Sequence, residues 1–426
     1  MQSIQSKAMQ KQKQLLILFV VMVFSGTGFS QSNYSLQKAL QTARSNNPVL
    51  KNQSYTINIA ESDAVTAKMR PNLTLGFNYI GVLGQQYQVA NTGTLNGANT
   101  QANFQLGKVF QLPGMRKNKI DLANQNTDLA HKNYAETERN LYQDVALKWL
   151  DVWTSQKQLE IVEKAKNNLD SLVIINKVRL KNQVITETDF NRTQLLANQY
   201  GLQIKSSEQN YRNELTELKY LLGSTEEITV DSKDGFNFIV PSSLNDFLNE
   251  AMEKRTDVQA AKSLIDAADT NIKLQRSMAY PQPELGVIYN PQNAIPYAGV
   301  YGTIDIPIFS RNQGEIKKSK YLKLQAEQGL EITHAQIQTE ITNAYHSYQT
   351  EKENVRNFDI LLPQSEAILK SVRYSYLRGG TTIIDFLEAQ RSWLETQQQY
   401  YDTMQHYRES YIKLLYTSGL INQIAQ

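Results

Sequence analysis

The sequence repeats itself, and this duplication restricts the fold more than any other feature. Leu40 and the apolar residues around it recur at Leu248, an offset of 208 residues. Later in each half the offset becomes 196, and Asp189 then corresponds to Asp385. A fold built twice from the same elements is the simplest explanation. We therefore expect a first repeat over residues 31–230 and a second over residues 231–426, which together form one structural unit.

Residues 1–30 have the pattern of a secretory signal peptide. Three lysines and no acidic residue precede the apolar run Leu15–Phe24, and small residues follow at Gly28 and Ser30. Ten apolar residues are too few to cross a bilayer as a helix. We expect residues 1–30 to be cleaved on export, and a short hydrophobic anchor is the alternative.

Charge and cysteine content exclude several classes of function. The chain has 44 Lys and Arg against 41 Asp and Glu, and the predicted signal peptide accounts for the excess of three lysines. A mature chain of zero net charge gives no electrostatic reason to expect nucleic-acid binding. The chain contains no cysteine, which excludes disulfides, thiolate metal sites and lipidation at an N-terminal Cys.

Apolar residues recur at steps of three and four along most of each repeat, which predicts long and largely solvent-exposed helices. Each repeat should begin with one helix that a proline terminates, at Pro71 or Pro281. A stretch of about 65 residues would extend about 100 Å as a helix. The expected helices are Leu36 to Met69, Arg116 to Leu180, Thr188 to Leu222, Leu244 to Met278, Gln313 to Leu377, and Thr382 to Ser418.

Two short segments in each repeat alternate between apolar and polar residues, which is the pattern of a strand with two different faces. Residues 73–79 and 102–108 alternate in the first repeat, and residues 284–289 and 300–306 alternate in the second. Residues 290–298, which contain two prolines, are expected to form a loop. Tyr79, Tyr87, Tyr289, Tyr297 and Phe309 lie near the expected strand ends, as interfacial aromatic residues do.

The helices are too polar to cover the apolar face of these strands, so lipid is the better candidate for that role. A soluble four-stranded sheet under one helix is the alternative. Four strands cannot close a transmembrane barrel, because about eight are the minimum. Three chains would supply twelve strands. The sequence thus favours an α+β membrane protein with a trimeric 12-stranded β-barrel, four strands per chain, continued by a long α-helical coiled-coil barrel.

Three sequence segments carry a resemblance to a known family. They are "LQKALQTARSNNPVL" from Leu36, "VFQLPGMRKNKI" from Val109 and "SYLRGGTTIIDFLEAQRSW" from Ser375. Together with the duplication, they resemble the TolC-like outer membrane efflux proteins over nearly all of residues 34–422. The second segment is similar to the form found in exporters of heavy metals and other cations.

The resemblance implies a passive exit duct in the outer membrane of a Gram-negative bacterium, with a periplasmic extension, and not an enzyme. It implies a homotrimer, a periplasmic adaptor (membrane fusion protein) and an inner-membrane pump, with an RND pump favoured over an ABC pump. No cofactor is implied. Cations, heavy metals or small toxic compounds are the expected cargo. A type I secretion duct is the alternative, and a soluble periplasmic coiled-coil scaffold is a further one.

The resemblance also assigns roles to residues where the long helices reverse direction. Asn182 and Gln183 in the first repeat, and Gly379 and Gly380 in the second, would form hairpin tips where the duct closes and the adaptor docks. Asp189 and Tyr376 would latch neighbouring hairpins, although Thr381 stands where the family has an arginine.

Asp385 and Glu388 lie three residues apart, on one face of a helix. In a trimer they would form two carboxylate rings that constrict the channel and select cations. Crowding of these carboxylates is expected to raise the pKa values of the ring. An ordinary solvated helix face is the alternative interpretation of this pair. The sequence lacks the Gly-x-Ser-x-Gly, His-Glu-x-x-His and phosphate-loop motifs of enzymes.

Overall fold

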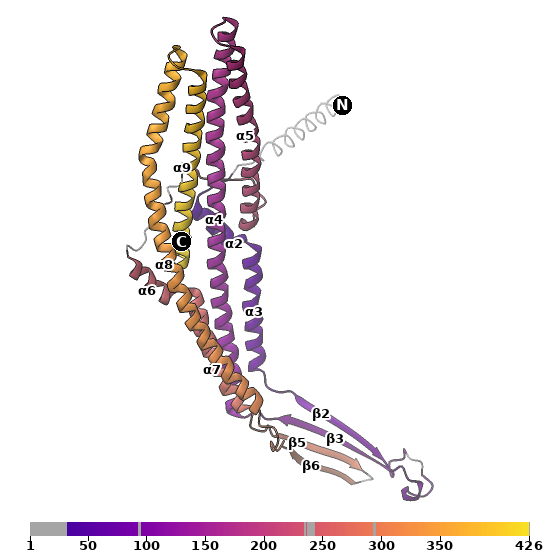
Figure 1. Cartoon of the computed structure of the whole chain (residues 1–426). Coiled ribbons are helices and arrows are strands. Elements are labelled where there is room, and N and C mark those ends of the chain that lie inside the picture. Colours follow the sequence, from indigo (N-terminus) through magenta and orange to yellow (C-terminus); the bar gives the residue numbers. More distant parts are fainter. Residues whose placement is uncertain (1–31, 93–94, 234–235, 237–242, 293–294, 426) are drawn as a thin grey trace, which may run out of the picture.

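The computed structural model describes residues 32–92, 95–233, 236, 243–292 and 295–425. The predicted signal peptide lies outside these residues. Two long helical hairpins extend from a middle region, and a separate β-sheet lies at the other end of the molecule (Figure 1).

The hairpins agree closely with the helices predicted from the sequence. The first consists of α4 (Pro113–Lys181) and α5 (Glu187–Leu222), and the second of α8 (Gln313–Leu377) and α9 (Ile383–Thr417). Helix α4 packs against α9 and thereby joins the two hairpins, so the four helices lie in the order α8, α9, α4, α5 (Figure 1). Helix α8 remains helical on both sides of Pro363.

The prediction of one continuous helix at the start of each repeat was wrong. The structure has α2 (Leu36–Asn46) and α3 (Pro48–Lys68) in the first repeat, and α6 (Leu244–Lys254) and α7 (Thr256–Ser277) in the second. Extended residues at Asn47 and Arg255 separate the helices of each pair. The Asn47 side chain accepts hydrogen bonds from two backbone N–H groups of α3 and so caps that helix.

Each of these breaks holds the C-terminal end of the return helix in its own repeat. Asn47 donates from Nδ2 to the carbonyl oxygen of Leu221 at 2.7 Å. Arg255 donates from its guanidinium to the carbonyl oxygen of Thr417 at 2.9 Å. The two joints are equivalent in the duplication, because Asn47 and Arg255 are 208 residues apart and Leu221 and Thr417 are 196 apart. These bonds satisfy terminal carbonyls of α5 and α9, where each return helix ends.

The joint of the second repeat contains a buried ionic network. Arg255 makes two hydrogen bonds to the Asp257 carboxylate, at 2.6 and 3.0 Å, and a third to Glu340 at 2.9 Å. Arg139, from the first repeat, is buried beside them and donates to the carbonyl oxygen of Tyr416 at 2.8 Å. Replacing Asp257 would take two hydrogen bonds from the buried Arg255 guanidinium and would therefore be destabilising, because a buried charge would be left with fewer partners.

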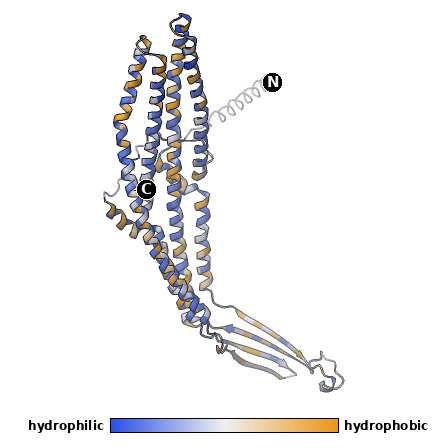
Figure 2. Cartoon of the chain, in the orientation of Figure 1, coloured by the Kyte–Doolittle hydropathy of each residue, from blue (hydrophilic) through white to orange (hydrophobic). Residues whose placement is uncertain are grey.

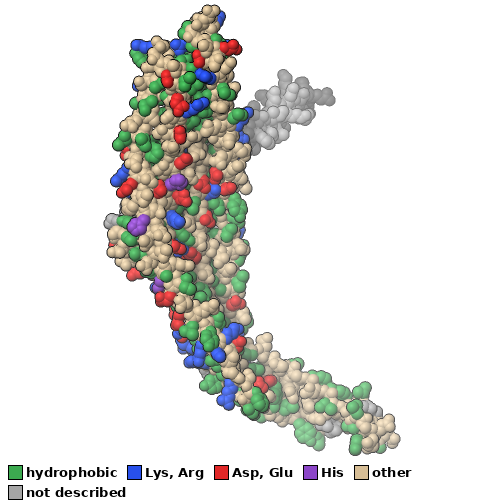
Figure 3. Space-filling view, in the orientation of Figure 1, with side chains coloured by type: hydrophobic (Ala, Val, Ile, Leu, Met, Phe, Trp, Pro, Cys, Tyr) green, Lys and Arg blue, Asp and Glu red, His purple; other side chains and the backbone are tan. Residues whose placement is uncertain are grey.

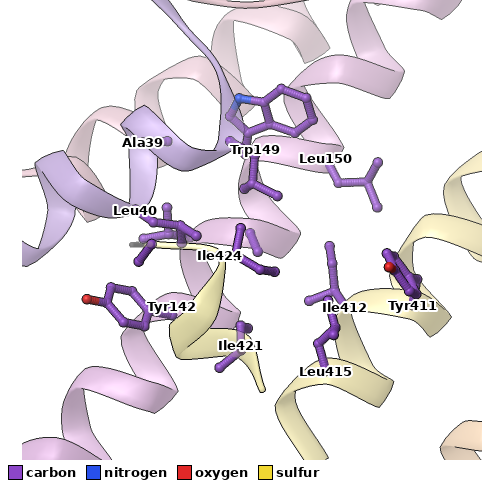
Figure 4. Close-up of a cluster of buried hydrophobic side chains, with 14 of the residues drawn as sticks. Ala39, Leu40, Tyr142, Trp149, Leu150, Tyr411, Ile412, Leu415, Ile421 and Ile424 are labelled. Carbon is purple, nitrogen blue, oxygen red and sulfur yellow. The ribbon is translucent and has the colours of Figure 1, made fainter. Parts of the chain in front are cut away.

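The largest hydrophobic core lies at the level of these joints. Trp149 of α4 is fully buried, and its indole N–H donates to the carbonyl oxygen of Tyr34 at 2.9 Å. Leu40 packs on α4 from one side. Ile412 and Leu415 of α9 pack on α4 from another side (Figure 4). Truncating Trp149 to Ala would cost about 3–5 kcal/mol at such a site. This core ties the two repeats together.

The sequence analysis missed a small parallel sheet beside this core. Strand β1 (Ser32–Tyr34) pairs in parallel with β4 (Ile228–Val230). Strand β4 lies at the end of the first repeat, in a segment where helical periodicity is lost. The short 3-10 helix η2 (Ile421–Gln423) follows α9 near the end of the chain.

The larger sheet has four antiparallel strands in the order β2-β3-β5-β6. They are β2 (Leu73–Gly81), β3 (Thr100–Val109), β5 (Glu284–Gln292) and β6 (Ile295–Thr303). The short 3-10 helix η1 (Gln85–Tyr87) follows β2. The expected loop over residues 290–298 was wrong, because Pro291 and Pro296 pair across β5 and β6. Proline is tolerated on β6 because β6 is an edge strand.

The predicted division of the strands into two faces is confirmed by the register. Leu75 lies opposite Leu106, which lies opposite Val287, and Val287 lies opposite Val300. These four apolar side chains therefore cross the whole sheet on one face. They are exposed, with Leu75 at 75% and Val300 at 86%. Apolar and polar residues are interspersed along β2 and β3 (Figure 2). Among the described residues, no helix is both long and apolar enough to cross a membrane.

Candidate functional site

The two hairpin tips are built in the same way. After α4, Gln183 adopts a left-handed backbone with φ of 58°, and after α8, Gly379 does so with φ of 80°. In the first tip, Gln183 N–H donates to the Leu180 carbonyl at 2.9 Å and Val184 N–H to the Arg179 carbonyl at 2.8 Å. The second tip repeats this pattern at Gly379 and Gly380. This pair of bonds is the Schellman motif, which satisfies the last carbonyls of a helix.

The return helices also begin with equivalent side-chain caps. Thr186 caps α5 and accepts from the backbone N–H of Asp189, and Thr382 caps α9 and accepts from that of Asp385. The four predicted docking residues Asn182, Gln183, Gly379 and Gly380 are all exposed at the tips. The tips therefore present exposed backbone and polar side chains, together with the exposed apolar side chains of Val184 and Ile384.

Asp385, one of the two predicted constriction residues, serves as a helix cap in the single chain. Its Oδ2 accepts hydrogen bonds from the Thr381 hydroxyl at 2.6 Å, the Thr382 hydroxyl at 2.7 Å and the Thr382 backbone N–H at 3.0 Å. These bonds hold the pKa of Asp385 below its usual value, chiefly through the two threonine hydroxyls. In the single chain this direction is opposite to the one expected from the sequence.

Glu388, the second predicted constriction residue, is free of such bonds. Its side chain is 72% exposed, and its only ion pair among the described residues is to Arg391 at 4.0 Å. An ion pair this long and exposed contributes little. The carboxylate of Glu388 is therefore available to an ion in solution, whereas that of Asp385 is partly occupied by its own helix.

A cavity of about 570 Å³ lies between the two tips and brings the predicted latch residues together. Asp189 and Tyr376 both line it, as do Gln183 and Gly379. The two latch side chains do not bond to each other in the described structure. The Tyr376 hydroxyl donates instead to Oδ1 of Asn176 at 2.7 Å. The nearest cation to Asp189 is Arg192, at 3.9 Å.

The sequence analysis missed Asn176 and Arg179, which contact Tyr376 from the other hairpin. Arg179 lies over the Tyr376 ring at 4.8 Å and donates to the Tyr376 carbonyl at 3.3 Å. It supplies a guanidinium to this contact, where the resemblance had pointed to Thr381. The available signal in the sequence was a polar asparagine within an apolar helical stripe. The structure shows that Asn176 is fully buried there, and a buried polar side chain requires a hydrogen-bond partner.

The tips thus combine a contact between the two hairpins, through Tyr376, Asn176 and Arg179, with the exposed carboxylate of Glu388. Within the described part of the chain, no three His, Cys, Asp or Glu side chains come close enough to hold a metal ion.

Comparison with known proteins identifies the family. The sequence pattern of the outer membrane efflux protein family matches residues 39–224 and 247–419. The chain is 20% identical over 376 residues to the pyoverdine export outer membrane protein OpmQ of Pseudomonas putida, covering 84% of this chain and 80% of that protein. It is 20% identical over 443 residues to outer membrane protein TolC of Salmonella enteritidis, covering 96% and 87%.

Solved structures agree at the level of the fold. The chain superposes on the crystal structure of CusC with a TM-score of 0.74 and 19% identity, covering 92% of this chain and 94% of that one. The relatives are outer membrane channel proteins and not enzymes, as the resemblance implied. Because the family pattern covers most of both repeats, the chain belongs to the outer membrane efflux protein family.

Proposed function

We propose that three copies of this chain form one continuous exit duct across the outer membrane and into the periplasm. The observation that carries the proposal is the four-stranded sheet, which has an apolar exposed face and two edge strands, β2 and β6. Pairing β2 of one copy with β6 of the next would close twelve strands and remove every unpaired edge. The apolar face would then contact lipid.

The helices would continue the duct on the periplasmic side. Helices α5 and α8 are the outer members of the row of four, so they are free to pack against neighbouring copies. The six hairpin tips of a trimer would then converge and close the duct. Asp385 and Glu388 would line this constriction, and Tyr376 and Asp189 would take part in latching the hairpins.

The partners follow from the proposed duct. A periplasmic adaptor would dock at the tips, around Asn182, Gln183, Gly379 and Gly380, and an inner-membrane pump, of RND type in preference to ABC type, would load the cargo. Small toxic compounds or cations are the proposed cargo. The relative named for pyoverdine export supports small organic molecules. The likeness to CusC is one of fold and does not support metal cargo by itself. Cleavage of residues 1–30 and the division at residue 230 belong to the same proposal.

Mass and conductance together test the duct. Mature protein purified in detergent would be measured by native mass spectrometry and then added to a planar bilayer. We expect three chains per particle and stepwise conductance. A monomer that needs no detergent and leaves the bilayer current unchanged would contradict the proposal and would favour a soluble scaffold.

A further inference from the structure

Charged residues are distributed unevenly around the four-stranded sheet. The sequence has no Asp, Glu, Lys or Arg between residues 71 and 107 or between residues 285 and 304, which contain nearly all of both strand hairpins. Residues 68–70, 108–121, 273–284 and 305–320 flank these hairpins on the side of the helices. They contain twelve Lys and Arg against four Asp and Glu. The positive charge is thus concentrated where the sheet meets the helices.

Six of these cations form what we call the basic collar: Arg70, Lys117, Lys119, Arg276, Lys317 and Lys320. All six are exposed, and none forms an ion pair within the described part of the chain. Figure 3 shows Lys and Arg side chains gathered where the lower ends of the helices approach the sheet. Uncompensated cations at this density create a positive surface potential, which attracts anions.

Exposed apolar side chains lie in the same flanking segments as the collar in both repeats. Phe110 follows β3 and is 45% exposed, and Phe309 follows β6 and is 92% exposed. Ile306 and Ile308 precede Phe309 and are exposed as well. Lys108 lies over the Phe110 ring at 5.7 Å, and a phenyl ring next to a cation is the arrangement that anchors proteins at a membrane surface, with the ring among acyl chains and the cation among headgroups. A site for a free anion would not need these apolar neighbours.

The surface is also hollowed at two points of the collar. A hollow of about 670 Å³ on α8 is lined by Lys317, Lys318, Tyr321 and Leu322, among others. A second hollow, of about 320 Å³, lies at the start of α4 and is lined by Arg116, Lys117 and Ile120, among others. Both combine cations with apolar side chains. The Nε of Arg116 is buried and has no hydrogen-bond partner in the described structure.

We propose that the basic collar binds the phosphate headgroups of anionic phospholipids in the periplasmic leaflet of the outer membrane. This inference rests on the proposed function, because it needs the sheet to lie in that membrane. The far end of the sheet has no charged residue, so the collar also sets how deeply the barrel sits and which end faces the periplasm. Each exposed Lys or Arg near an anionic membrane surface adds to the attraction, so the effect of the collar grows with the number of its cations.

The collar is tested by the lipid preference of variants in which neutral glutamine replaces lysine. The collar variant is Lys117→Gln, Lys119→Gln, Lys317→Gln and Lys320→Gln. The matched control removes four exposed lysines elsewhere, by Lys51→Gln, Lys205→Gln, Lys370→Gln and Lys413→Gln. Retention of phosphatidylglycerol and phosphatidylcholine in detergent micelles would be measured by native mass spectrometry. We expect the parent and the control to prefer phosphatidylglycerol, and the collar variant to lose about tenfold or more of that preference.

Two further measurements separate the effect of charge from that of the side chain, and lipid binding from phosphate binding. Lysine-to-arginine changes at the four collar positions should retain the preference, because they keep the charge. Inorganic phosphate should not displace the lipid, and full displacement would assign the site to free phosphate instead. An unchanged preference for phosphatidylglycerol in the collar variant would contradict the proposal that the collar binds anionic lipid headgroups. If the parent conducts in bilayers yet retains both lipids equally, only the collar fails, whereas a parent that never inserts contradicts the duct itself.

Discussion

The hydroxyl of Tyr376 donates a 2.7 Å hydrogen bond to Oδ1 of Asn176, a residue 200 positions earlier in the chain. Asn176 also donates from Nδ2 to the Thr193 hydroxyl at 3.0 Å. One buried amide thereby connects α4, α5 and α8 near the tips. Both Asn176 and Tyr376 are buried, so the bond is shielded from water. A buried polar contact of this kind specifies one arrangement of the hairpins and is lost when they separate.

Replacing Tyr376 with Phe should loosen the contact between the two hairpins. The change leaves Oδ1 of Asn176 buried without that donor, which costs about 1–3 kcal/mol. We expect a larger or longer-lived open state in planar-bilayer recordings, and faster amide exchange at the start of α9. Tyr374→Phe is the matched control, because Tyr374 is 56% exposed and lies under Arg378. Equal behaviour of the two variants would show that the Tyr376 hydroxyl does not hold the tips together.

Neutralising Asp385 and Glu388 separately should give different results. Asp385→Asn disturbs the capping box of α9 as well as the charge, because Oδ2 accepts three hydrogen bonds from Thr381 and Thr382. It should destabilise the tip, because the capping box is weakened. Glu388→Gln removes only an exposed charge. We expect both to reduce cation selectivity, measured as a reversal potential, and only Asp385→Asn to speed amide exchange at the tip.

The lowered pKa of Asp385 fixes the direction of its pH dependence. A carboxylate with a depressed folded-state pKa contributes stability at pH values above its unfolded value of about 3.9. That contribution is lost as the pH falls through the lower folded value. The contribution of Asp385 to tip stability should therefore stay constant between about pH 5 and pH 8. A parent-minus-variant difference in amide exchange that changes across this range would indicate that neighbouring carboxylates of an assembled ring raise the pKa instead.

Replacing the left-handed residue of the first tip, Gln183, with glycine should increase the stability of that tip. Gln183 has φ of 58° where its counterpart Gly379 has 80°, and a side chain in this region is strained by about 1–2 kcal/mol. Gln183→Gly should therefore stabilise the first tip, and Gly379→Ala should destabilise the second by a similar amount. Gly380→Ala is the control, because Gly380 has no positive φ. Urea unfolding of the purified protein would measure all three, and no difference between Gly379→Ala and Gly380→Ala would contradict the account.

The sequence predicted the long helices and the two strand faces because each depends on a local period. The stripe through Ile337 and Ile341 marks one side of α8, and the alternation from Leu73 to Tyr79 marks one face of β2. These patterns survive in the structure because they reflect which side of an element meets water. The family resemblance rests on the same segments, and the comparisons confirm it.

The errors arose where distant residues decide the local structure. Arg255 lies at a helix break and bonds to Thr417, and Asn47 likewise bonds to Leu221, more than 150 residues away in each case. Asn176 could not be matched with Tyr376 for the same reason. At Asn47 a local signal was also present, because the Asn47 side chain caps α3 and Pro48 begins it. Pro291 and Pro296 suggested a loop, yet both lie in paired strands. Local sequence does not contain these partners, so local reasoning could not predict these contacts.

Arginine substitutions on the two faces of β2 should distinguish lipid from lumen. Leu75 lies on the apolar face, in line with Leu106, Val287 and Val300, whereas Asn78 lies on the opposite face and pairs with Asn103. If the apolar face contacts lipid near the middle of the bilayer, Leu75→Arg should cost about 2–4 kcal/mol, and Asn78→Arg should cost far less because it faces water. Both residues are exposed in the single chain, so neither change disturbs packing within it.

The folded fraction of each variant in lipid bilayers, measured as a function of urea concentration, would give the difference. Leu75→Gln serves as an uncharged control that separates polarity from charge. Equal tolerance of arginine on the two faces would mean that neither meets lipid, and the barrel assignment would have to be abandoned for a soluble sheet.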